Sequence, residues 1–188
     1  MCIRDSARRI VQHVKDQESK GFSYEGANAS FDLVLRRALP NYEAPFELVD
    51  FMVIVENKRR SSFGTGWRND GAEHPMLSEA TVKVRVGKNI IHTAAEGDGP
   101  VGALDGALRK GLIDAYPELS AIRLTDYKVR VVNEGVGTGA AVRVVIESAD
   151  GKNVWHTVGA STNILEASWL ALTDSFEWWL FNNNIITS

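Results

Sequence analysis

The chain has 188 residues, of which 44% are hydrophobic and 24% charged, and its formal net charge is −3. This composition is typical of a globular protein that buries a core, and no run of one sign marks a surface for nucleic acid or anionic lipid. The single cysteine, Cys2, excludes an internal disulfide framework and favours a reducing compartment. No apolar run reaches the ~18 residues of a membrane span, and no secretory signal pattern is present. We therefore expect a cytoplasmic protein that binds neither nucleic acid nor membrane.

Residues 7–45 are predicted to form a small helical subdomain. Ile10, Val14 and Gln17 recur at helical spacing, and Gly21 is typical of a helix end. A second helix and a linker after it are indicated by Ala29, Leu33, Arg36, Pro40 and Pro45.

From residue 46 onward the pattern changes to alternating apolar and polar residues. Three strands and a helix that begins at Pro100 are predicted, the strands at 48–55, 80–86 and 89–94. The helix has an apolar stripe made of Val101, Leu104, Leu108 and Leu112. Residues 56–77 are polar and glycine-rich, and we predict a long loop there.

The same order of elements then returns. "GKNIIHT" begins at Gly87 and "GKNVWHT" at Gly151, a shift of 151 − 87 = 64 residues. Strands are predicted at 124–132, 142–146 and 154–158, with a hairpin turn four residues longer than its counterpart. A last helix starts near Asn163, whose spacing to Glu166 matches a capping box. We predict an α+β fold in residues 46–188, with two β-β-β-α repeats that share a core and a seam for a small ligand.

Few residues point to chemistry. His92 and His156 occupy matching positions, but neither has a second ligand at metal spacing, so ordinary strand positions are the better interpretation. No nucleophile elbow, phosphate loop or Cys-His pair is present. The aromatic cluster around Trp169 and Trp179 favours core packing or a dimer contact. We therefore predict no catalytic residue and no metal or cofactor in this chain.

The run "EGDGPVGALDGALRKGL" is the sharpest feature. Gly97 and Gly99 let a backbone approach a ligand closely, and Pro100 starts the helix. The free N–H groups that follow can bind a carboxylate, and Asp98 can bind an ammonium group, which together suit a free amino acid. The same residues also fit a plain helix start.

Five segments carry a resemblance to a known family: "SEATVKVRV", "HTAAEGDGPVGALDGALRKGL", "LTDYKVRV", "VRVVIESADGK" and "VGASTNILEASWLALTDS". They resemble the C-terminal regulatory region of the citramalate synthases, relatives of the 2-isopropylmalate synthases. "KGFSYEGANASFDLVLRRAL" resembles the short subdomain that joins this region to the catalytic barrel. Residues 1–6, "MCIRDS", do not fit, and we expect them to be foreign or disordered.

The resemblance implies a parent enzyme that condenses acetyl-CoA with pyruvate in isoleucine biosynthesis. Its catalytic TIM barrel, which holds a divalent metal, is absent here, so we expect a C-terminal fragment that is inactive alone. In the family the end product binds at the interface of a homodimer. Carried over, the effector site comprises Gly97, Asp98, Gly99, Pro100, Val101, Gly102, Leu124, Tyr127, Val131, Thr138, Val142, Ala160 and Thr162.

Three other functions are compatible with parts of this pattern. A leucine-sensing domain of 2-isopropylmalate synthase has the same architecture, and one methylene changes binding by only ~1–3 kcal/mol, so isoleucine and leucine stay open. A double-stranded RNA-binding module needs a basic helix start, whereas the last helix has no lysine or arginine. A freestanding amino-acid sensor would not need the joining subdomain.

Overall fold

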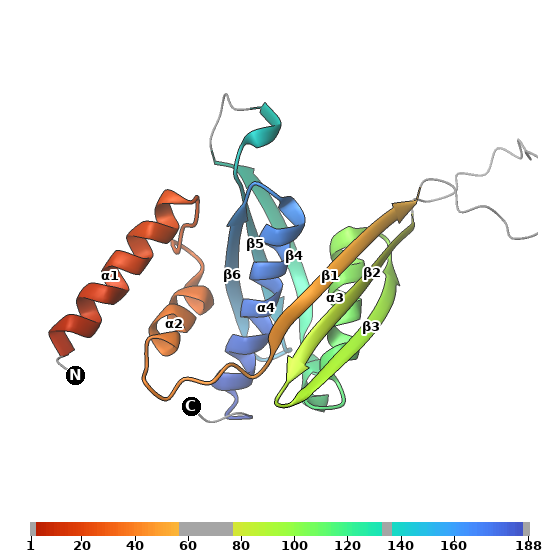
Figure 1. The fold of residues 1–188 in the computed structure, drawn as a ribbon, viewed down its shortest axis with the longest axis horizontal. Helices are drawn as coiled ribbons and strands as arrows, with labels where there is room; N and C mark the ends of the chain where they lie inside the picture. Colours follow the sequence, from red (N-terminus) through yellow and green to blue (C-terminus); the bar gives the residue numbers. More distant parts are fainter. Residues whose placement is uncertain (1–2, 57–76, 133–136, 186–188) are drawn as a thin grey trace, which may run out of the picture. The chain divides into compact units, whose positions relative to one another are not determined.

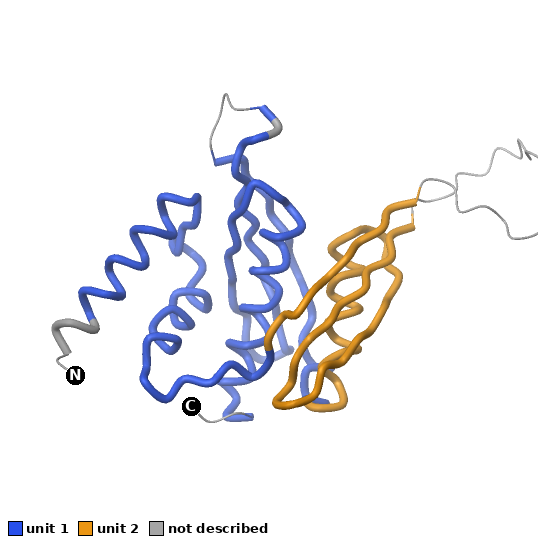
Figure 2. Tube along the Cα trace, viewed as in Figure 1, with its two compact units in different colours: residues 1–46, 116–188 blue, residues 47–115 orange. Residues whose placement is uncertain are grey.

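The computed structural model describes residues 3–56, 77–132 and 137–185, which form two compact units. One unit combines Met1–Phe46 with Tyr116–Ser188, and the other is Glu47–Ala115 (Figure 2). The helical segment is therefore grouped with the second repeat, and the first repeat forms a unit of its own.

The first repeat is a three-stranded antiparallel sheet followed by one helix. Its elements are β1 (Glu47–Glu56), β2 (Leu77–Val86), β3 (Asn89–Gly97) and α3 (Pro100–Leu112), with the strands in the order β1-β2-β3 (Figure 1). Alternation along β2 puts three side chains on the face that α3 covers, all fully buried: Ala80, Val82 and Val84. Leu104, Leu108 and Leu112 of the predicted helical stripe are also fully buried.

The second repeat has the same plan. Its elements are β4 (Arg123–Val131), β5 (Val142–Ala149), β6 (Val154–Ser161) and α4 (Ile164–Asn182), with two short 3-10 turns, η1 (Pro117–Ala121) and η2 (Gly137–Gly139). Val144 and Ile146 of β5 and Trp155 of β6 are fully buried, and α4 packs on both strands. The predicted α+β fold with two β-β-β-α repeats is confirmed.

The two repeats also agree in how the helix is fastened to the sheet. Thr93 Oγ1 donates a 2.7 Å hydrogen bond to the carbonyl oxygen of Ala107, and Thr157 Oγ1 donates one of 2.7 Å to that of Ala171. The donor and the acceptor of the second bond each lie 64 positions after their counterparts in the first, since 157 − 93 = 64 and 171 − 107 = 64. The duplicated sequence therefore encodes the same bond between the third strand and the helix in each repeat.

A second contact between helix and sheet also recurs, but the glycine lies on the helix in the first repeat and on the strand in the second. In the first repeat a Cβ on Gly106 of the helix would lie 3.1 Å from the Cβ of Ala95 on the strand. In the second, the strand residue is Gly159, and a Cβ there would lie 2.9 Å from the Cβ of Leu170 and overlap the carbonyl oxygen of Ala167. One partner of each contact is glycine, so the helix approaches its sheet closely in both repeats.

The helical segment contains α1 (Ile3–Ser19) and α2 (Asn28–Arg37), and α2 packs against α4 and β6. Ala29 and Leu33, predicted on the second helix, are fully buried. Gly21 follows α1 with φ of 104°, which fits its predicted place at a helix end. The helix α1 starts at Ile3, ahead of the predicted start at Ala7.

The second hairpin turn is not four residues longer than the first, so this prediction is wrong. Gly87 and Gly151 both take positive φ, 57° and 86°, and the shift of 64 residues holds on both sides of the turn. The ladder ends at Ala149 and Val154, whereas in the first repeat it runs on to Val86 and Asn89. The difference is therefore one lost strand pair and not an insertion.

The predicted loop at 56–77 lies outside the described residues except for its ends, which belong to β1 and β2. Within the part of the chain that the structure describes, no helix is long and apolar enough to cross a membrane.

Candidate functional site

The predicted site begins where β3 meets α3. Gly97 ends the strand so near the helix that a Cβ there would lie 2.5 Å from the backbone nitrogen of Ala103. Gly99 is the extended N-cap, with φ of −163° and ψ of 169°, and Pro100 opens the first turn. Because residue 97 has no room for a Cβ, glycine is required there to bring the end of the sheet against the start of the helix.

The first turn of α3 leaves backbone N–H groups without a side-chain partner. No side chain in the described part of the chain caps Gly99, and this turn holds no acidic residue. The first intrahelical bond runs from the N–H of Ala103 to the carbonyl oxygen of Gly99, at 3.0 Å. The N–H groups of Val101 and Gly102 are therefore open to an external oxygen, with the exposed Asp98 preceding them.

The start of α4, which corresponds to the start of α3, has a side-chain cap. Asn163, 163 − 99 = 64 positions after Gly99, accepts a 2.9 Å hydrogen bond from the N–H of Leu165, which confirms the predicted N-cap. The reciprocal capping box is wrong, because Glu166 accepts a 2.5 Å bond from Ser161 Oγ and not from the N–H of Asn163. The same fold thus has one capped helix and one uncapped helix.

Three predicted site residues lie on one face of β4. Strand alternation alone would put Leu124 and Tyr127 on opposite faces, because they are three residues apart. A bulge between Leu124 and Asp126 adds the extra residue and turns both toward the α4 side, together with Val131. The same irregularity occurs in β1.

Tyr127 is bonded to the start of α4. The Tyr127 hydroxyl lies 2.8 Å from Ser168 Oγ. The Ser168 hydroxyl in turn lies 2.7 Å from the carbonyl oxygen of Ile164. Since the single Ser168 proton goes to the carbonyl, the Tyr127 hydroxyl is the donor in the first bond. The ring of Tyr127 is half-buried and holds a fixed position beside β4.

The apolar side of β4 is only partly covered by its own helix. Val129 and Val131 keep 40% and 58% of their surface exposed. On the corresponding side of β1, Leu48 and Val55 keep 37% and 46%. Each helix packs on the second and third strands of its sheet, so the first strand offers apolar surface to a ligand or partner.

The remaining predicted residues are divided. Val142 pairs with Val131 and joins the same face. Ala160 points to the other face, where it lines a cleft of about 1080 Å³ between α1, α2, β6 and α4. Thr162 is exposed after β6, and Thr138 lies in η2, with its side chain outside the described part.

The structure therefore places Leu124, Tyr127, Val131 and Val142 on one face of the second sheet, with Leu124 and Val131 near opposite ends of β4. Gly97–Gly102 belongs to the unit Glu47–Ala115, and the other predicted residues belong to the unit that combines Met1–Phe46 with Tyr116–Ser188. That the two sets form one site stays a prediction.

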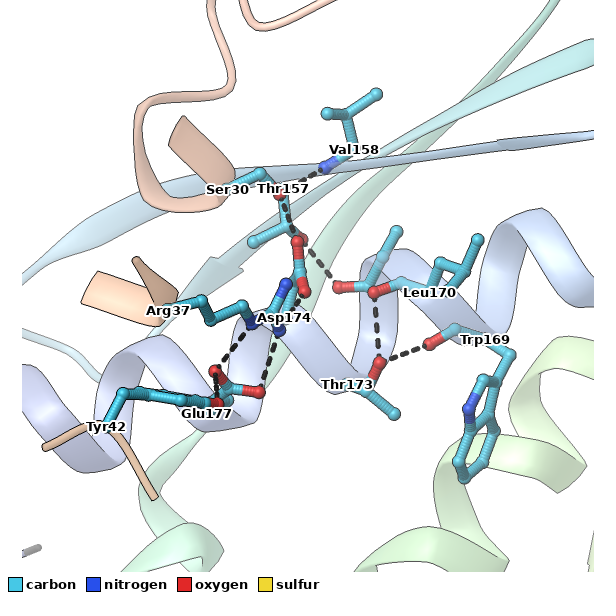
Figure 3. Close-up of polar contacts among 11 residues, drawn as sticks. Ser30, Arg37, Tyr42, Thr157, Val158, Trp169, Leu170, Thr173, Asp174 and Glu177 are labelled. Carbon is cyan, nitrogen blue, oxygen red and sulfur yellow. Dashed lines mark hydrogen bonds and ion pairs between the residues drawn. The ribbon is translucent and has the colours of Figure 1, made fainter. Parts of the chain in front are cut away.

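Sequence reasoning missed a polar cluster that joins α2 to α4, here named the Arg37 cluster (Figure 3). Arg37 Nη2 lies 2.6 Å from Asp174 and 2.8 Å from Glu177, and Arg37 Nε donates to Glu177 at 3.0 Å. Tyr42 donates to Glu177 at 2.6 Å, and Ser30 donates to Asp174 at 2.7 Å. The available signal was the absence of lysine and arginine from α4, so that a buried carboxylate on this helix needs a cation from another element.

Burial and the neighbouring charges together shift the pKa values in this cluster. Burial raises the pKa of Asp174, and the Arg37 charge and the Ser30 hydrogen bond offset only part of that effect. Burial alone would lower the pKa of Arg37, but the charge of Asp174 and the hydrogen bond to Glu177 outweigh it, so the pKa is raised. Burial and the bond to Glu177 raise the pKa of Tyr42, which keeps its proton.

The two matching histidines differ in their surroundings. His156 Nε2 lies 3.1 Å from a Glu147 carboxylate oxygen, while His92 is exposed opposite Lys83. In the described ranges, no group of three or more His, Cys, Asp and Glu side chains is placed to hold a metal ion.

A family model described as the LeuA allosteric (dimerisation) domain matches residues 25–179. The chain belongs to this family. The matched residues include α2, the first repeat and the second repeat up to Trp179, and the helix α1 precedes them.

Several curated proteins are similar to this chain in sequence. The chain is 45% identical to the (R)-citramalate synthase of Geobacter sulfurreducens over 177 residues and 42% identical to that of Aquifex aeolicus over 168. These alignments cover 94% and 89% of the chain but 31% and 30% of the relatives, so the chain spans about a third of their length. A 2-isopropylmalate synthase of Ruminiclostridium cellulolyticum is 34% identical over 94 residues, which is 50% of the chain and 17% of that relative. The resemblance to citramalate synthases is confirmed, and the 2-isopropylmalate synthases match more weakly.

Proposed function

We propose that this LeuA domain regulates a citramalate synthase-like enzyme, acts as a homodimer and binds isoleucine as its feedback effector. The family description, allosteric and dimerisation, supports regulation and self-association. The relatives' name supports the enzyme class. The parent enzyme would condense acetyl-CoA with pyruvate in a separate barrel that holds a divalent metal. This chain alone would be inactive and would work in the cytoplasm.

The uncapped start of α3 is the observation that carries the effector proposal. Its N–H groups and helix dipole suit a carboxylate, and the glycines around it leave space for a ligand backbone. The capped start of α4 is the internal comparison, because the repeat could have carried a capping side chain at Gly99 as it does at Asn163. Glycine there costs some helix stability, which is consistent with a site reserved for a ligand.

The side chain of the effector would lie against β4. Leu124, Val131 and Val142 supply aliphatic surface, and Tyr127 supplies a fixed ring. Such a surface suits a branched aliphatic side chain, and its incomplete cover supports closure by a second copy of the chain. Effector binding would favour an arrangement in which the catalytic part works poorly, with a coupling free energy of ~1–3 kcal/mol.

Calorimetric titration of the chain with isoleucine and with leucine tests the proposal, after light scattering has established its oligomeric state. Saturable binding that is tighter for isoleucine supports a citramalate synthase regulatory domain. Tighter binding of leucine would instead assign the domain to a 2-isopropylmalate synthase. A dimer that binds neither amino acid would contradict effector sensing by this chain.

A further inference from the structure

The Arg37 cluster holds α2 against the second repeat. Arg37, the last residue of α2, faces two carboxylates of α4 that are one turn apart, Asp174 and Glu177 (Figure 3). Near the other end of α2, Ser30 Oγ donates to Asp174 and accepts the backbone N–H of Val158 in β6 at 3.0 Å. Both ends of the short helix are therefore bonded to the body formed by β6 and α4.

The same helix α4 holds Tyr127 of the proposed effector site. Ser168 binds the Tyr127 hydroxyl six residues before Asp174, since 174 − 168 = 6. Six helical residues span about 9 Å at a rise of ~1.5 Å per residue. A movement of Tyr127 and a movement of Arg37 therefore act on one short length of α4.

This length of α4 is fastened to β6 at two points. Trp155 Nε1 donates to Ser175 Oγ at 2.9 Å, and Thr157 Oγ1 donates to the Ala171 carbonyl at 2.7 Å. Because these two bonds and close packing hold α4 on β6, we expect the length between Ser168 and Asp174 to move as one piece with the strand. Displacement at one end is passed to the other end.

Arg37 is suited to sense such a displacement. Its planar guanidinium donates from two nitrogens to two carboxylates, an arrangement that depends strongly on geometry. If α4 shifts relative to α2, Asp174 or Glu177 loses the guanidinium, and a buried carboxylate without its partner is costly. The contact therefore favours either a fully docked α2 or a loosened one.

We propose that the Arg37 cluster couples the effector site to the helical segment, so that an amino acid bound beside Tyr127 changes how firmly α2 is held on α4. This coupling rests on the proposed effector function, and the change in how α2 is held is the effect of binding within this chain. Arg37 acts as a positioning residue, because it would not touch the effector.

Hydrogen exchange of the α2 backbone amides, followed with and without saturating isoleucine, tests the coupling. In the wild-type chain isoleucine changes their exchange rates by about fivefold or more, as expected for allosteric coupling. The triple variant Arg37→Met, Asp174→Asn, Glu177→Gln removes all three charges together and leaves no buried carboxylate unpaired. Arg37→Lys keeps the charge without the two-pronged donor, and Arg85→Met, which removes an exposed pair with Glu47 in the other unit, is the control.

In the triple variant we expect isoleucine to bind while the α2 exchange rates change by less than about twofold, with Arg37→Lys in between and Arg85→Met like the wild type. Isoleucine binding to the wild type with no change in α2 exchange would overturn the coupling but leave the effector proposal intact. A triple variant that responds as the wild type does would also overturn it. Absence of any isoleucine binding would contradict the proposed function and the coupling with it.

Discussion

The hydroxyl of Tyr127 donates a 2.8 Å hydrogen bond to Ser168 Oγ, so that a strand residue of the proposed effector pocket is fixed to the first turns of α4. Replacement of Tyr127 by phenylalanine removes only this bond. We expect Tyr127→Phe to lower the free energy of unfolding by about 0.5–1.5 kcal/mol. Urea denaturation measures the loss.

A double-mutant cycle with Ser168→Ala assigns that loss to the pair. The two single changes should add to more than the double change, because each removes the same bond. Additive effects would show that Tyr127 and Ser168 contribute independently. In the same series, Tyr127→Ala removes the ring and should abolish isoleucine binding in calorimetry, if the pocket is as proposed.

Substituting Gly99 with asparagine copies the cap of the second repeat into the first. The backbone at Gly99 is extended and nothing lies within 4 Å of a Cβ there, so the side chain has room. We expect Gly99→Asn to stabilise the chain by a few tenths of a kcal/mol. We also expect it to weaken isoleucine binding at least about tenfold, because the asparagine side-chain oxygen would accept hydrogen bonds that the N–H groups would otherwise donate to the effector carboxylate.

The control for this variant is Asp114→Asn, an exposed change just beyond the C-terminal end of α3. It should alter neither stability nor binding. Unchanged isoleucine affinity in Gly99→Asn would show that the carboxylate binds somewhere other than the start of α3.

Gly97 and Gly99 form a matched pair for the geometry of this turn. Gly97→Ala places a Cβ 2.5 Å from the backbone nitrogen of Ala103, and we expect a cost of roughly 1–3 kcal/mol in unfolding free energy. Gly99→Ala meets open space and should cost less, about 0.5–1 kcal/mol, because alanine is a poorer N-cap than glycine. Equal effects in chemical denaturation would contradict the close approach of β3 to α3.

Asp150 gives the chain a dependence of stability on pH. Burial would raise its pKa, but hydrogen bonds from the Trp179 indole and from the backbone N–H groups of Asn153 and Lys152 outweigh it and lower the pKa to about 2. Because the folded pKa lies below the ordinary value of 3.8, this contribution is present above that value and is lost as the pH falls from 3.8 toward 2.

Urea denaturation of wild type and Asp150→Asn at about pH 5 and about pH 2.5 tests this dependence. At the higher pH we expect the wild type to have a larger free energy of unfolding than Asp150→Asn. At the lower pH we expect this difference in free energy to narrow. A gap that is the same at both pH values would show that the Asp150 carboxylate is not held in its charged form by these bonds.

The strands and helices of both repeats could be predicted because local patterns determine them. Alternation along β2 identified Val82 and Val84 as buried, and the spacing of Leu104 and Leu108 identified the covered face of α3. The 64-residue shift alone was enough to predict a duplicated fold, which the equivalent bonds of Thr93 and Thr157 confirm at atomic detail.

Other features depend on contacts that no local pattern encodes. Leu124 and Tyr127 share a face only because of a bulge, which alternation does not reveal. Arg37 meets Asp174 across 137 positions of sequence, and such a pairing follows from tertiary packing alone. The close contact of Gly159 with Leu170 is also apparent only once strand and helix are in place.

The most direct test of the central claim is an NMR titration of the isotope-labelled chain with isoleucine, in which the backbone amides are followed one by one. The account predicts that the amide signals of Val101 and Gly102, at the start of α3, move most on saturation, because their N–H groups bind the carboxylate. Signals of Tyr127 and Val131 should move with them. Saturable binding that leaves Val101 and Gly102 unchanged and instead moves residues around Ala160 would contradict the account, and would place the effector in the cleft between α1, α2, β6 and α4.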